Sequence, residues 1–251
     1  MEMISVSGLY ISLSGKEVIK EISFELNSGE TLVLMGKNGA GKSVLLKIIA
    51  GLMPGFTGEV LVKGEPVQTA AGRVKPYSGG NPAIAYVFQK GGLFDSMSVF
   101  DNAAFGLRRM GLTESEVQSR VLSSLERVGL KGSEKKYPSD LSGGMQKRVG
   151  LARAVCMEPD IILFDDPTAG LDPILSDSMA DLILDITGTS GKAAIAVTND
   201  IKVAEKIAHK AALLFDGRFV YYGSGKDFFL EADDYSRQFI NGDIEGPIDA
   251  Y

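Results

Sequence analysis

The chain has 251 residues, and its hydrophobic content of 45% is enough for a substantial core in one large domain or two small ones. Its 26 basic and 32 acidic residues give a formal net charge of −6, which argues against a nucleic-acid-binding surface. No stretch reaches the roughly 18 consecutive apolar residues that span a bilayer, and the first residues lack the layout of a signal peptide, so we expect a soluble cytoplasmic chain.

Apolar runs alternate with helical patterns along the chain, as in an α/β protein. We expect strands at residues 3–6, 18–26, 31–35, 59–63, 84–88, 161–165, 193–198, 211–215 and 218–222. We expect helices at residues 43–52, 114–128, 142–157, 174–187 and 200–208. The pair Asp216-Gly217 between two apolar segments predicts a tight hairpin, so part of the β structure is antiparallel.

The segments between these elements have distinct compositions. Residues 64–82 contain many glycines and prolines and are predicted to form a loop-rich connection. Residues 91–140 combine glycines near each end with a helical pattern, which indicates a helical subdomain inserted into the larger domain. The single cysteine, Cys156, excludes a disulfide within the chain and is expected to be a buried helical thiol. The last residues, 231–251, are rich in Asp and Gly, and composition alone predicts a frayed acidic end.

A phosphate-binding loop lies between the apolar run 31–35 and the first predicted helix. Residues 36–43 read Gly-Lys-Asn-Gly-Ala-Gly-Lys-Ser, and the glycines let successive N–H groups converge on phosphate oxygens at a helix N-terminus. Lys42 would reach the β- and γ-phosphates, and the Ser43 hydroxyl would bind Mg²⁺. The predicted nucleotide-binding residues are Gly36, Lys37, Asn38, Gly39, Ala40, Gly41, Lys42, Ser43 and Val44.

A second motif lies in the middle of the chain. Leu141-Ser-Gly-Gly-Met145 opens a predicted helix with a serine and two glycines, a pattern that suits anion binding but also occurs in ordinary turns. The apolar run Ile161-Ile-Leu-Phe then ends in Asp165, which is typical of a buried strand that presents a Mg²⁺-linked carboxylate.

Together these motifs resemble the ATP-binding subunits of ABC transporters over essentially the whole chain. The resemblance implies a P-loop NTPase fold, with a RecA-like α/β core, an antiparallel β portion and an inserted helical subdomain. It implies binding and hydrolysis of ATP with Mg²⁺. Gln89 in Tyr86-Val-Phe-Gln matches a glutamine that touches Mg²⁺ and links the site to the membrane subunit, so Ser43, Gln89 and Asp165 are the expected metal ligands.

The resemblance also implies an assembly. In the family, two chains clamp two ATP molecules head to tail, so Ser142, Gly143 and Gly144 would complete the site of the opposite chain. Gly170-Leu-Asp-Pro173 matches the loop that communicates across the dimer, and the helical subdomain carries movement to an integral membrane permease. Such subunits lie on the inner face of the cell membrane through the permease. Phe94, Met97 and Phe100 are candidates for the groove that receives a permease helix, and they are equally well explained as subdomain core.

Two further segments narrow the resemblance to the ATPases of Mla/Mce-type phospholipid transporters. Residues 89–107 and Met145 are similar to the corresponding segments of those ATPases. Residues 237–247 look like their C-terminal extension, which reaches onto the partner subunit. The implied organisation is an ATPase domain over 1–235 and a dimer arm over 236–251, in which Phe239 and Ile240 bury against the second chain and Tyr251 helps to anchor the end. A substrate-binding Mce-type protein is the further partner that this resemblance implies.

The chain departs from the family pattern at three positions. Asp166 stands where the family has the glutamate that polarises the attacking water, and because a misplacement of 1 Å can cost on the order of a hundredfold, we expect slow hydrolysis. Asn199 stands where a histidine senses the γ-phosphate; its amide can still donate a hydrogen bond but cannot become cationic. Leu13 falls where an aromatic ring stacks on adenine, with Tyr10 close by as a substitute. The only histidine, His209, is interpreted as a helix-end residue.

These departures leave two hypotheses open. One is a slow ATPase motor, and the other is an ATP-gated dimerising subunit with a degenerate site. A homodimer with no competent site could not reset, which favours slow hydrolysis, whereas a heterodimer with a complete second ATPase chain would allow a degenerate site. An ABC ATPase that acts on DNA or ribosomes is disfavoured by the acidic charge and by the lack of a long coiled-coil insertion or a second cassette.

Overall fold

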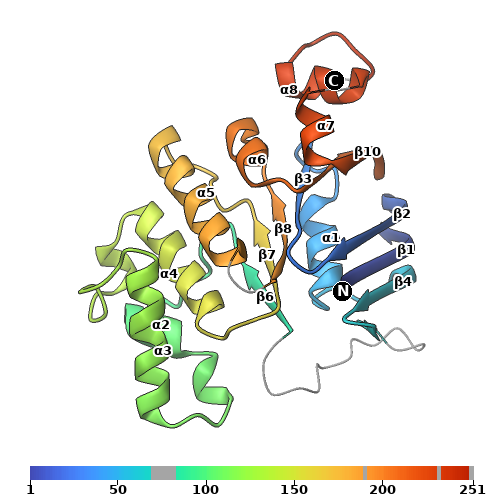
Figure 1. Cartoon of the computed structure of the whole chain (residues 1–251). Coiled ribbons are helices and arrows are strands. Elements are labelled where there is room, and N and C mark those ends of the chain that lie inside the picture. The colour runs from blue at the N-terminus through green and yellow to red at the C-terminus, as the bar shows by residue number, and fades with distance from the viewer. Residues whose placement is uncertain (69–82, 189–190, 231–232, 249–251) are drawn as a thin grey trace. The chain divides into compact units, whose positions relative to one another are not determined.

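The computed structural model describes residues 1–68, 83–188, 191–230 and 233–248. The chain divides into two compact units, Met1–Pro76 with Thr187–Tyr251, and Tyr77–Ile186, which we call the first and the second unit (Figure 1). The predicted subdomain at 91–140 lies within the range of the second unit. Among the described residues, no helix combines the length and apolar character needed to cross a membrane.

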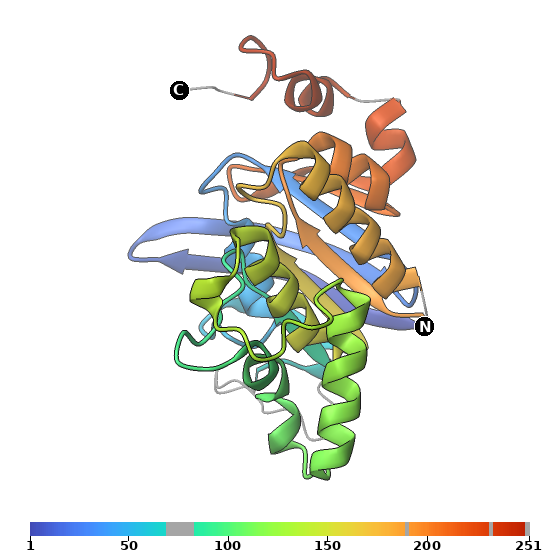
Figure 2. The ribbon, with the colours of Figure 1, turned by 90° about the vertical axis from the view of Figure 1, so that its left-hand side faces the viewer.

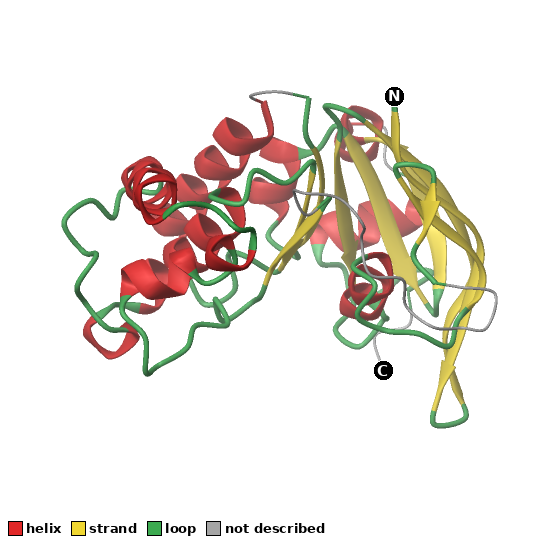
Figure 3. Ribbon diagram, turned by 90° about the horizontal axis from the view of Figure 1, so that it is seen from below, coloured by secondary structure: helices red, strands yellow, loops and turns green. Residues whose placement is uncertain are grey.

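The first unit contains an antiparallel sheet with the strand order β2-β1-β4-β5. Its strands are β1 (Glu2–Leu13), β2 (Lys16–Asn27), β4 (Thr57–Val62) and β5 (Glu65–Pro66). Strand β1 is longer than predicted because Ser14 and Gly15 both have positive φ angles, 50° and 80°, and turn β1 directly into β2. The resulting long hairpin is drawn in yellow in Figure 3.

The remaining strands of the first unit follow the order β10-β9-β3-β8. They are β3 (Thr31–Gly36), β8 (Ala193–Val197), β9 (Lys210–Phe215) and β10 (Arg218–Ser224). Strand β3 is parallel to both β8 and β9 and is buried along its whole length, as expected for an apolar strand of a parallel sheet. The hairpin predicted at Asp216-Gly217 is confirmed between β9 and β10.

Among its described residues, the first unit contains four helices. They are α1 (Lys42–Ile49), α6 (Ile201–Ile207), α7 (Gly225–Leu230) and α8 (Asp234–Asn241). The short helices α7 and α8 were not predicted, and α8 lies in the Asp- and Gly-rich end of the chain. Between α6 and β9, His209 has a backbone role: its Nδ1 accepts a hydrogen bond of 3.2 Å from the N–H of Thr31.

Residues 233–248 are folded, so the frayed end that composition alone predicts is wrong for this part of the chain. The Asp233 side chain caps α8 by accepting a hydrogen bond of 2.8 Å from the N–H of Ser236. The Gln238 amide then holds the chain beyond α8, because its Oε1 accepts from the N–H of Ile248 at 2.6 Å and its Nε2 donates to the Ile248 carbonyl at 2.9 Å. Figure 2 shows α8 and this returning segment in dark red. Tyr251 lies outside the described residues, as does most of the predicted loop 64–82.

The second unit is built on two parallel strands and a group of helices. Strand β6 (Ile84–Val87) pairs with β7 (Ile161–Asp165), with Tyr86 opposite Leu163. Helices α2 (Val99–Ala104), α3 (Glu114–Arg127) and α4 (Gly143–Val155) pack against one another, and α5 (Pro173–Gly188) follows β7. Helix α3, the long green helix in Figure 2, has a Thr113/Glu116 capping box and buries Val117, Val121 and Leu125 at four-residue spacing.

Candidate nucleotide-binding site

The three glycines of the phosphate loop are required for two different physical reasons. Gly36 has a φ of 145°, and a Cβ atom there would lie 2.2 Å from the carbonyl oxygen of Leu214 on β9. Gly41 has a φ of 107°, and a Cβ there would press against Ile19 at 3.0 Å. Gly39 has a φ of 81° but faces open space. Close packing therefore fixes the two ends of the loop, and backbone conformation alone requires the glycine in the middle.

Lys42 lies inside the curve of this loop, at the first position of α1. Its side chain is 8% exposed, and its Nζ donates to the carbonyl oxygens of Gly36 at 2.5 Å and Lys37 at 2.9 Å. The N-cap of α1 is Gly41, so no capping side chain competes for the N–H groups at the helix start. A buried ammonium group and a helix N-terminus thus form an anion-binding cradle. Ser43 and Val44, the next two residues of α1, are half-buried.

Asn199 lies next to the loop. It follows β8, and because β8 pairs with β3 in parallel, the chain leaves both strands at the same edge of the sheet. The Asn199 Nδ2 donates to the Oδ1 of Asn38 at 3.4 Å, and both residues are exposed. Asp200 caps α6 through the N–H groups of Lys202 and Val203, which fixes the backbone beside Asn199.

The two candidates for adenine stacking lie on the long hairpin of the first unit. Leu13, at the end of β1, is 36% exposed. The Tyr10 hydroxyl donates to Oε1 of Glu17 at 2.9 Å, and this bond to a carboxylate raises the pKa of Tyr10. The hairpin therefore presents one aliphatic side chain and one aromatic side chain with an anchored hydroxyl.

In the second unit, two carboxylates follow one another at the end of β7. Asp165 is the last residue of the strand, and its Oδ2 accepts a hydrogen bond of 2.7 Å from the hydroxyl of Tyr86. Burial and this bond to Asp165 raise the pKa of Tyr86, so the phenol keeps its proton and acts as a donor. Asp166 has a left-handed backbone with a φ of 52°, a conformation that aspartate tolerates better than most residues.

Gln89 and Lys147 both contact Asp166. The Gln89 Nε2 donates to the Asp166 Oδ2 at 3.2 Å, and the Lys147 Nζ donates to the Asp166 carbonyl oxygen at 3.4 Å. Lys147 comes from α4 and is 9% exposed; burial lowers its pKa, and the negative charge of Asp166 opposes that shift. A carboxylate, an amide and an ammonium group therefore lie together at the end of β7.

The exposed start of α4 carries the serine-glycine-glycine motif. Ser142 is the N-cap, and its Oγ accepts from the N–H of Met145 at 3.3 Å. A Cβ on Gly143 would meet nothing within 4 Å, whereas one on Gly144 would touch Leu175 of α5 at 3.5 Å. Beside it, Leu175 is 38% exposed and Ile174 is 82% exposed. This face of the second unit combines a helix N-terminus with exposed apolar side chains.

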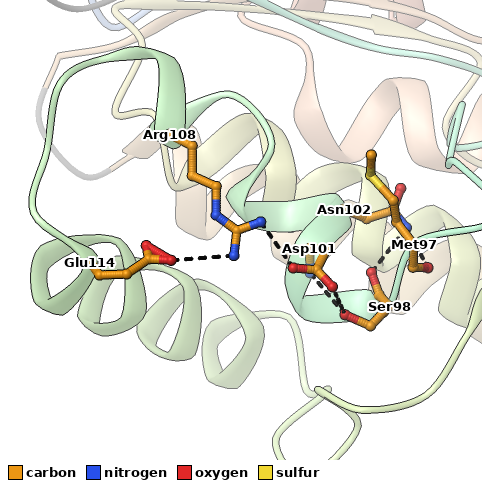
Figure 4. Close-up of polar contacts among 6 residues, drawn as sticks. All are labelled: Met97, Ser98, Asp101, Asn102, Arg108 and Glu114. Carbon is orange, nitrogen blue, oxygen red and sulfur yellow. Dashed lines mark hydrogen bonds and ion pairs between the residues drawn. The ribbon is translucent and has the colours of Figure 1, made fainter.

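The segment after Gln89 is held in shape by one buried side chain. Asn102 is fully buried, and its Nδ2 donates to the carbonyl oxygens of Phe94, Met97 and Ser98 at 3.0–3.1 Å. Figure 4 shows Asn102 beside Met97 and Ser98, and it shows Arg108 joined to both Asp101 and Glu114. The hydrogen bond that the Ser98 hydroxyl donates to the Asp101 carboxylate is the main cause of the lowered pKa of Asp101.

The three groove candidates lie on or next to this segment. Phe94 is 41% exposed and packs against Phe105 with the two rings tilted, whereas Met97 and Phe100 are half-buried.

Sequence reasoning missed two residues of this site. Tyr86 lies in an apolar strand and reads as core, and Lys147 lies in a helix among other basic residues and reads as solvated surface. No local signal distinguishes either of them. Each acts through a contact with a residue 19 or 79 positions away in the chain.

The parallel strands and the phosphate loop define a P-loop nucleotide-binding protein. The sequence profile of the family described as ABC transporter matches residues 19–169. The chain therefore belongs to the ABC transporter family, and it is an ATP-binding subunit with an ABC-type ATPase fold.

Three relatives cover nearly the whole chain. The intermembrane phospholipid transport system ATP-binding protein MlaF of Escherichia coli K12 is 37% identical, over 92% of this chain and 86% of MlaF. The probable ribonucleotide transport ATP-binding protein mkl of Mycobacterium leprae is 36% identical, over 98% of this chain and 70% of mkl. The chloroplastic protein TRIGALACTOSYLDIACYLGLYCEROL 3 of Arabidopsis thaliana is 36% identical, over 98% of this chain and 75% of that protein.

Two solved structures are similar in fold. The protein cbiO1 of Clostridium perfringens, part of the ABC transporter complex cbiONQ, superposes with a TM-score of 0.80 at 28% identity, over 94% of each chain. The ATP-binding cassette MJ0796, in a dimeric post-hydrolysis state bound to ADP and Pi, gives a TM-score of 0.77 at 26% identity, over 88% of this chain and 98% of that one.

Proposed function

We propose that the chain is the ATP-hydrolysing subunit of a transporter that moves phospholipid or a related lipid between bacterial membranes. The observation that carries this proposal is the 37% identity to MlaF over 92% of the chain. The name of mkl points to ribonucleotides instead, so the cargo is the part of the proposal that most needs a test. The order of events is that of an ATP-driven clamp that closes on nucleotide and reopens after hydrolysis.

In this proposal the first unit binds the phosphates. The N–H groups of residues 36–44 and the Lys42 ammonium would hold the β- and γ-phosphates, because the loop already curves around Lys42. Asn199 would donate to a γ-phosphate oxygen from its position beside Asn38. Leu13 or Tyr10 would pack on the adenine ring.

The second unit would supply two of the metal ligands and position the water. Ser43 of the first unit, with Gln89 and Asp165, offers a hydroxyl, an amide and a carboxylate oxygen, a set of hard donors that suits Mg²⁺. When bound, Mg²⁺ would neutralise negative charge on the phosphates. Asp166 would orient the attacking water, with its carboxylate held by Gln89 and its backbone by Lys147.

The partners follow from the same reasoning. Two such chains, or one with another ABC ATPase, would pair so that Ser142, Gly143 and Gly144 face the nucleotide of the opposite chain, and the exposed Ile174 and Leu175 beside them supply apolar surface for that contact. The segment held by Asn102 would meet a membrane permease, which would keep the subunit on the inner face of the cell membrane. A substrate-binding Mce-type protein would complete the complex.

The C-terminal segment, 236–251, would act as a dimer arm appended to the ATPase domain of residues 1–235. Gln238 gives it a defined shape, while Phe239 and Ile240 are half-buried and Ile244 is 71% exposed, so apolar surface remains for a partner. A cavity of about 310 Å³ separates this segment from Lys37 of the phosphate loop. The arm is therefore close enough to the loop to link pairing with nucleotide binding.

A second candidate function is an ATP-gated dimerising subunit with little hydrolysis. The observation that favours it is the combination of Asp166 with Asn199. Compared with the family pattern, Asp166 is one methylene shorter than glutamate, and Asn199 cannot become cationic as histidine can. In a heterodimer, a complete second ATPase chain would supply the hydrolysing site, and this chain would supply one degenerate site.

The test of the proposed cargo is ATP-dependent transfer in vesicles that contain the chain with its copurified permease complex. Transfer of a fluorescent phospholipid that requires Mg-ATP and is lost in Lys42→Ala supports the proposal. ATP-dependent movement of a labelled ribonucleotide with no lipid transfer would contradict it. Lys42→Ala is the suitable blank because it removes the ammonium group from the phosphate loop.

A further inference from the structure

The hydroxyl of Tyr86 makes a short contact with the carboxylate at the end of the neighbouring strand. Tyr86 lies on β6 opposite Leu163 of β7, two residues before Asp165, so its side chain can reach the end of β7. The distance from the hydroxyl to the Asp165 Oδ2 is 2.7 Å, within the range of a charge-assisted O–H···O⁻ bond. The Tyr86 ring also packs on Phe88, with the ring centroids 4.7 Å apart.

The chemistry of this donor matters for a cation site. A phenol hydroxyl fixes the rotamer of a carboxylate without bringing a positive charge, so the full negative charge stays available to a divalent cation. A lysine or arginine in the same place would orient the carboxylate but would also repel the metal. Groups that hydrogen-bond to metal ligands set ligand orientation, and their loss typically lowers metal affinity or activity about 10- to 100-fold.

We propose that Tyr86 is the positioning residue for Asp165 and thereby sets the Mg²⁺ affinity of the nucleotide site. This inference rests on the proposed role of Asp165 as a metal ligand and adds a residue that sequence motifs do not mark. Tyr86 acts on the cation alone: the phosphate loop binds the phosphates through its own backbone and Lys42.

The experiment compares four forms of the full chain: wild type, Tyr86→Phe, Phe88→Leu and Asp165→Asn. Tyr86→Phe keeps the ring and removes only the hydroxyl, whereas Phe88→Leu changes the ring packing and keeps the hydroxyl. Binding of Mn²⁺ as a spectroscopic probe is measured by electron paramagnetic resonance in the presence of ADP. Affinity for a fluorescent ATP analogue is measured with Mg²⁺ and again with EDTA, and the melting temperature of each form is recorded.

The expected result is about tenfold weaker Mn²⁺ binding in Tyr86→Phe, with wild-type affinity for the analogue in EDTA and an unchanged melting temperature. Phe88→Leu should bind Mn²⁺ as the wild type does, and Asp165→Asn should lose Mn²⁺ binding. Wild-type Mn²⁺ binding in Tyr86→Phe beside a loss in Asp165→Asn would overturn this inference and leave the proposed metal site intact.

Two other outcomes would overturn the inference for different reasons. Retained Mn²⁺ binding in Asp165→Asn would remove Asp165 as a ligand, so the proposed metal site would fail together with the role of Tyr86. A loss of nucleotide binding in EDTA with a lower melting temperature in Tyr86→Phe would identify the hydroxyl as a general structural group rather than a positioning group for the cation ligand.

Discussion

The phosphate loop of the first unit and the carboxylates of the second unit are built in opposite ways. The loop consists of eight consecutive residues whose shape depends on backbone angles and on the space around two glycines. The pair Asp165-Asp166 is held by the side chains of Tyr86, Gln89 and Lys147, which come from β6, the segment after it, and α4. The first site can be recognised from consecutive residues of the sequence, whereas the second is assembled from side chains that lie far apart in the chain.

This difference has a practical consequence for substitutions. A loop made of backbone fails when one residue no longer fits, because its N–H groups move together. A site made of side chains can change gradually, since each donor controls a separate atom of the carboxylates. We therefore expect large, all-or-none effects in the loop and graded effects around Asp166.

The largest effect is expected for Gly36→Ala. Its Cβ would lie 2.2 Å from the Leu214 carbonyl, so strand β9 or the loop must shift, and we expect a loss of ATP binding together with destabilisation of about 3 kcal/mol. Gly39→Ala is the matched control: it faces open space and should cost only the roughly 1 kcal/mol of a left-handed alanine. Denaturant unfolding and nucleotide titration of both variants provide the measurement. Equal losses in the two would break the argument from close packing.

The second-largest effect is expected at the end of β7, where Lys147 contacts Asp166. Lys147→Met removes the ammonium group that contacts the Asp166 backbone, and we expect hydrolysis to fall by about tenfold to a hundredfold with ATP affinity unchanged. Separate determination of kcat and KM checks this split. An increase in KM alone would show that Lys147 serves nucleotide binding.

Lys147→Arg is the charge-conserving control and adds a pH test. Burial lowers the pKa of Lys147, so the wild type should lose its ammonium charge, and with it activity, at a lower alkaline pH than an ordinary lysine would. Arginine stays charged throughout this range, so the alkaline limb of the pH–rate profile should move upward. Identical alkaline limbs in the two forms would contradict a role for the Lys147 charge.

The strand and helix on either side of residues 36–41 were predicted from the sequence for an identifiable reason. Strand β3 is buried along its whole length and is mostly apolar, and the spaced glycines after it are typical of a turn with positive φ angles. The pattern of neighbouring residues was therefore sufficient to predict this part of the fold. The sequence failed at α8, where aspartates and glycines read as a frayed end. There the fold depends on Gln238 reaching Ile248, a contact that composition cannot reveal. Tyr86 and Lys147 were missed for the same reason.

The third effect is expected in the C-terminal segment, where the Gln238 side chain holds the chain beyond α8. Gln238→Ala should release residues 243–248 from α8, because the buried N–H and carbonyl of Ile248 lose their partner, at a local cost of about 1–3 kcal/mol. We expect faster hydrogen exchange there and weaker ATP-dependent dimerisation, as with deletion of residues 236–251. Sedimentation with ATP is the measurement, and the exposed Glu245→Ala is the control. Unchanged sedimentation of the deletion variant would contradict the proposed role of residues 236–251 as a dimer arm.

The smallest effect concerns the packing of α4, which carries Lys147. Burial raises the pKa of Cys156 to about 12, and its Sγ donates to the Ala103 carbonyl, so we expect negligible labelling by thiol reagents at neutral pH until the chain unfolds. The sign of the pH effect follows: above about pH 9 the unfolded chain releases this proton first, so the free energy of unfolding falls as the pH rises toward 12. Rapid labelling of the native protein would show that α4 is loosely packed.

The most direct test of the account is steady-state Mg-ATP hydrolysis by the chain with its copurified permease, using Lys42→Ala as the blank and Asp166→Glu as the comparison. We predict turnover above the blank that rises in Asp166→Glu, because the longer side chain restores the reach that the shorter carboxylate lacks. Tight ATP binding with no turnover in either form would contradict a working motor and identify the chain as a gating subunit.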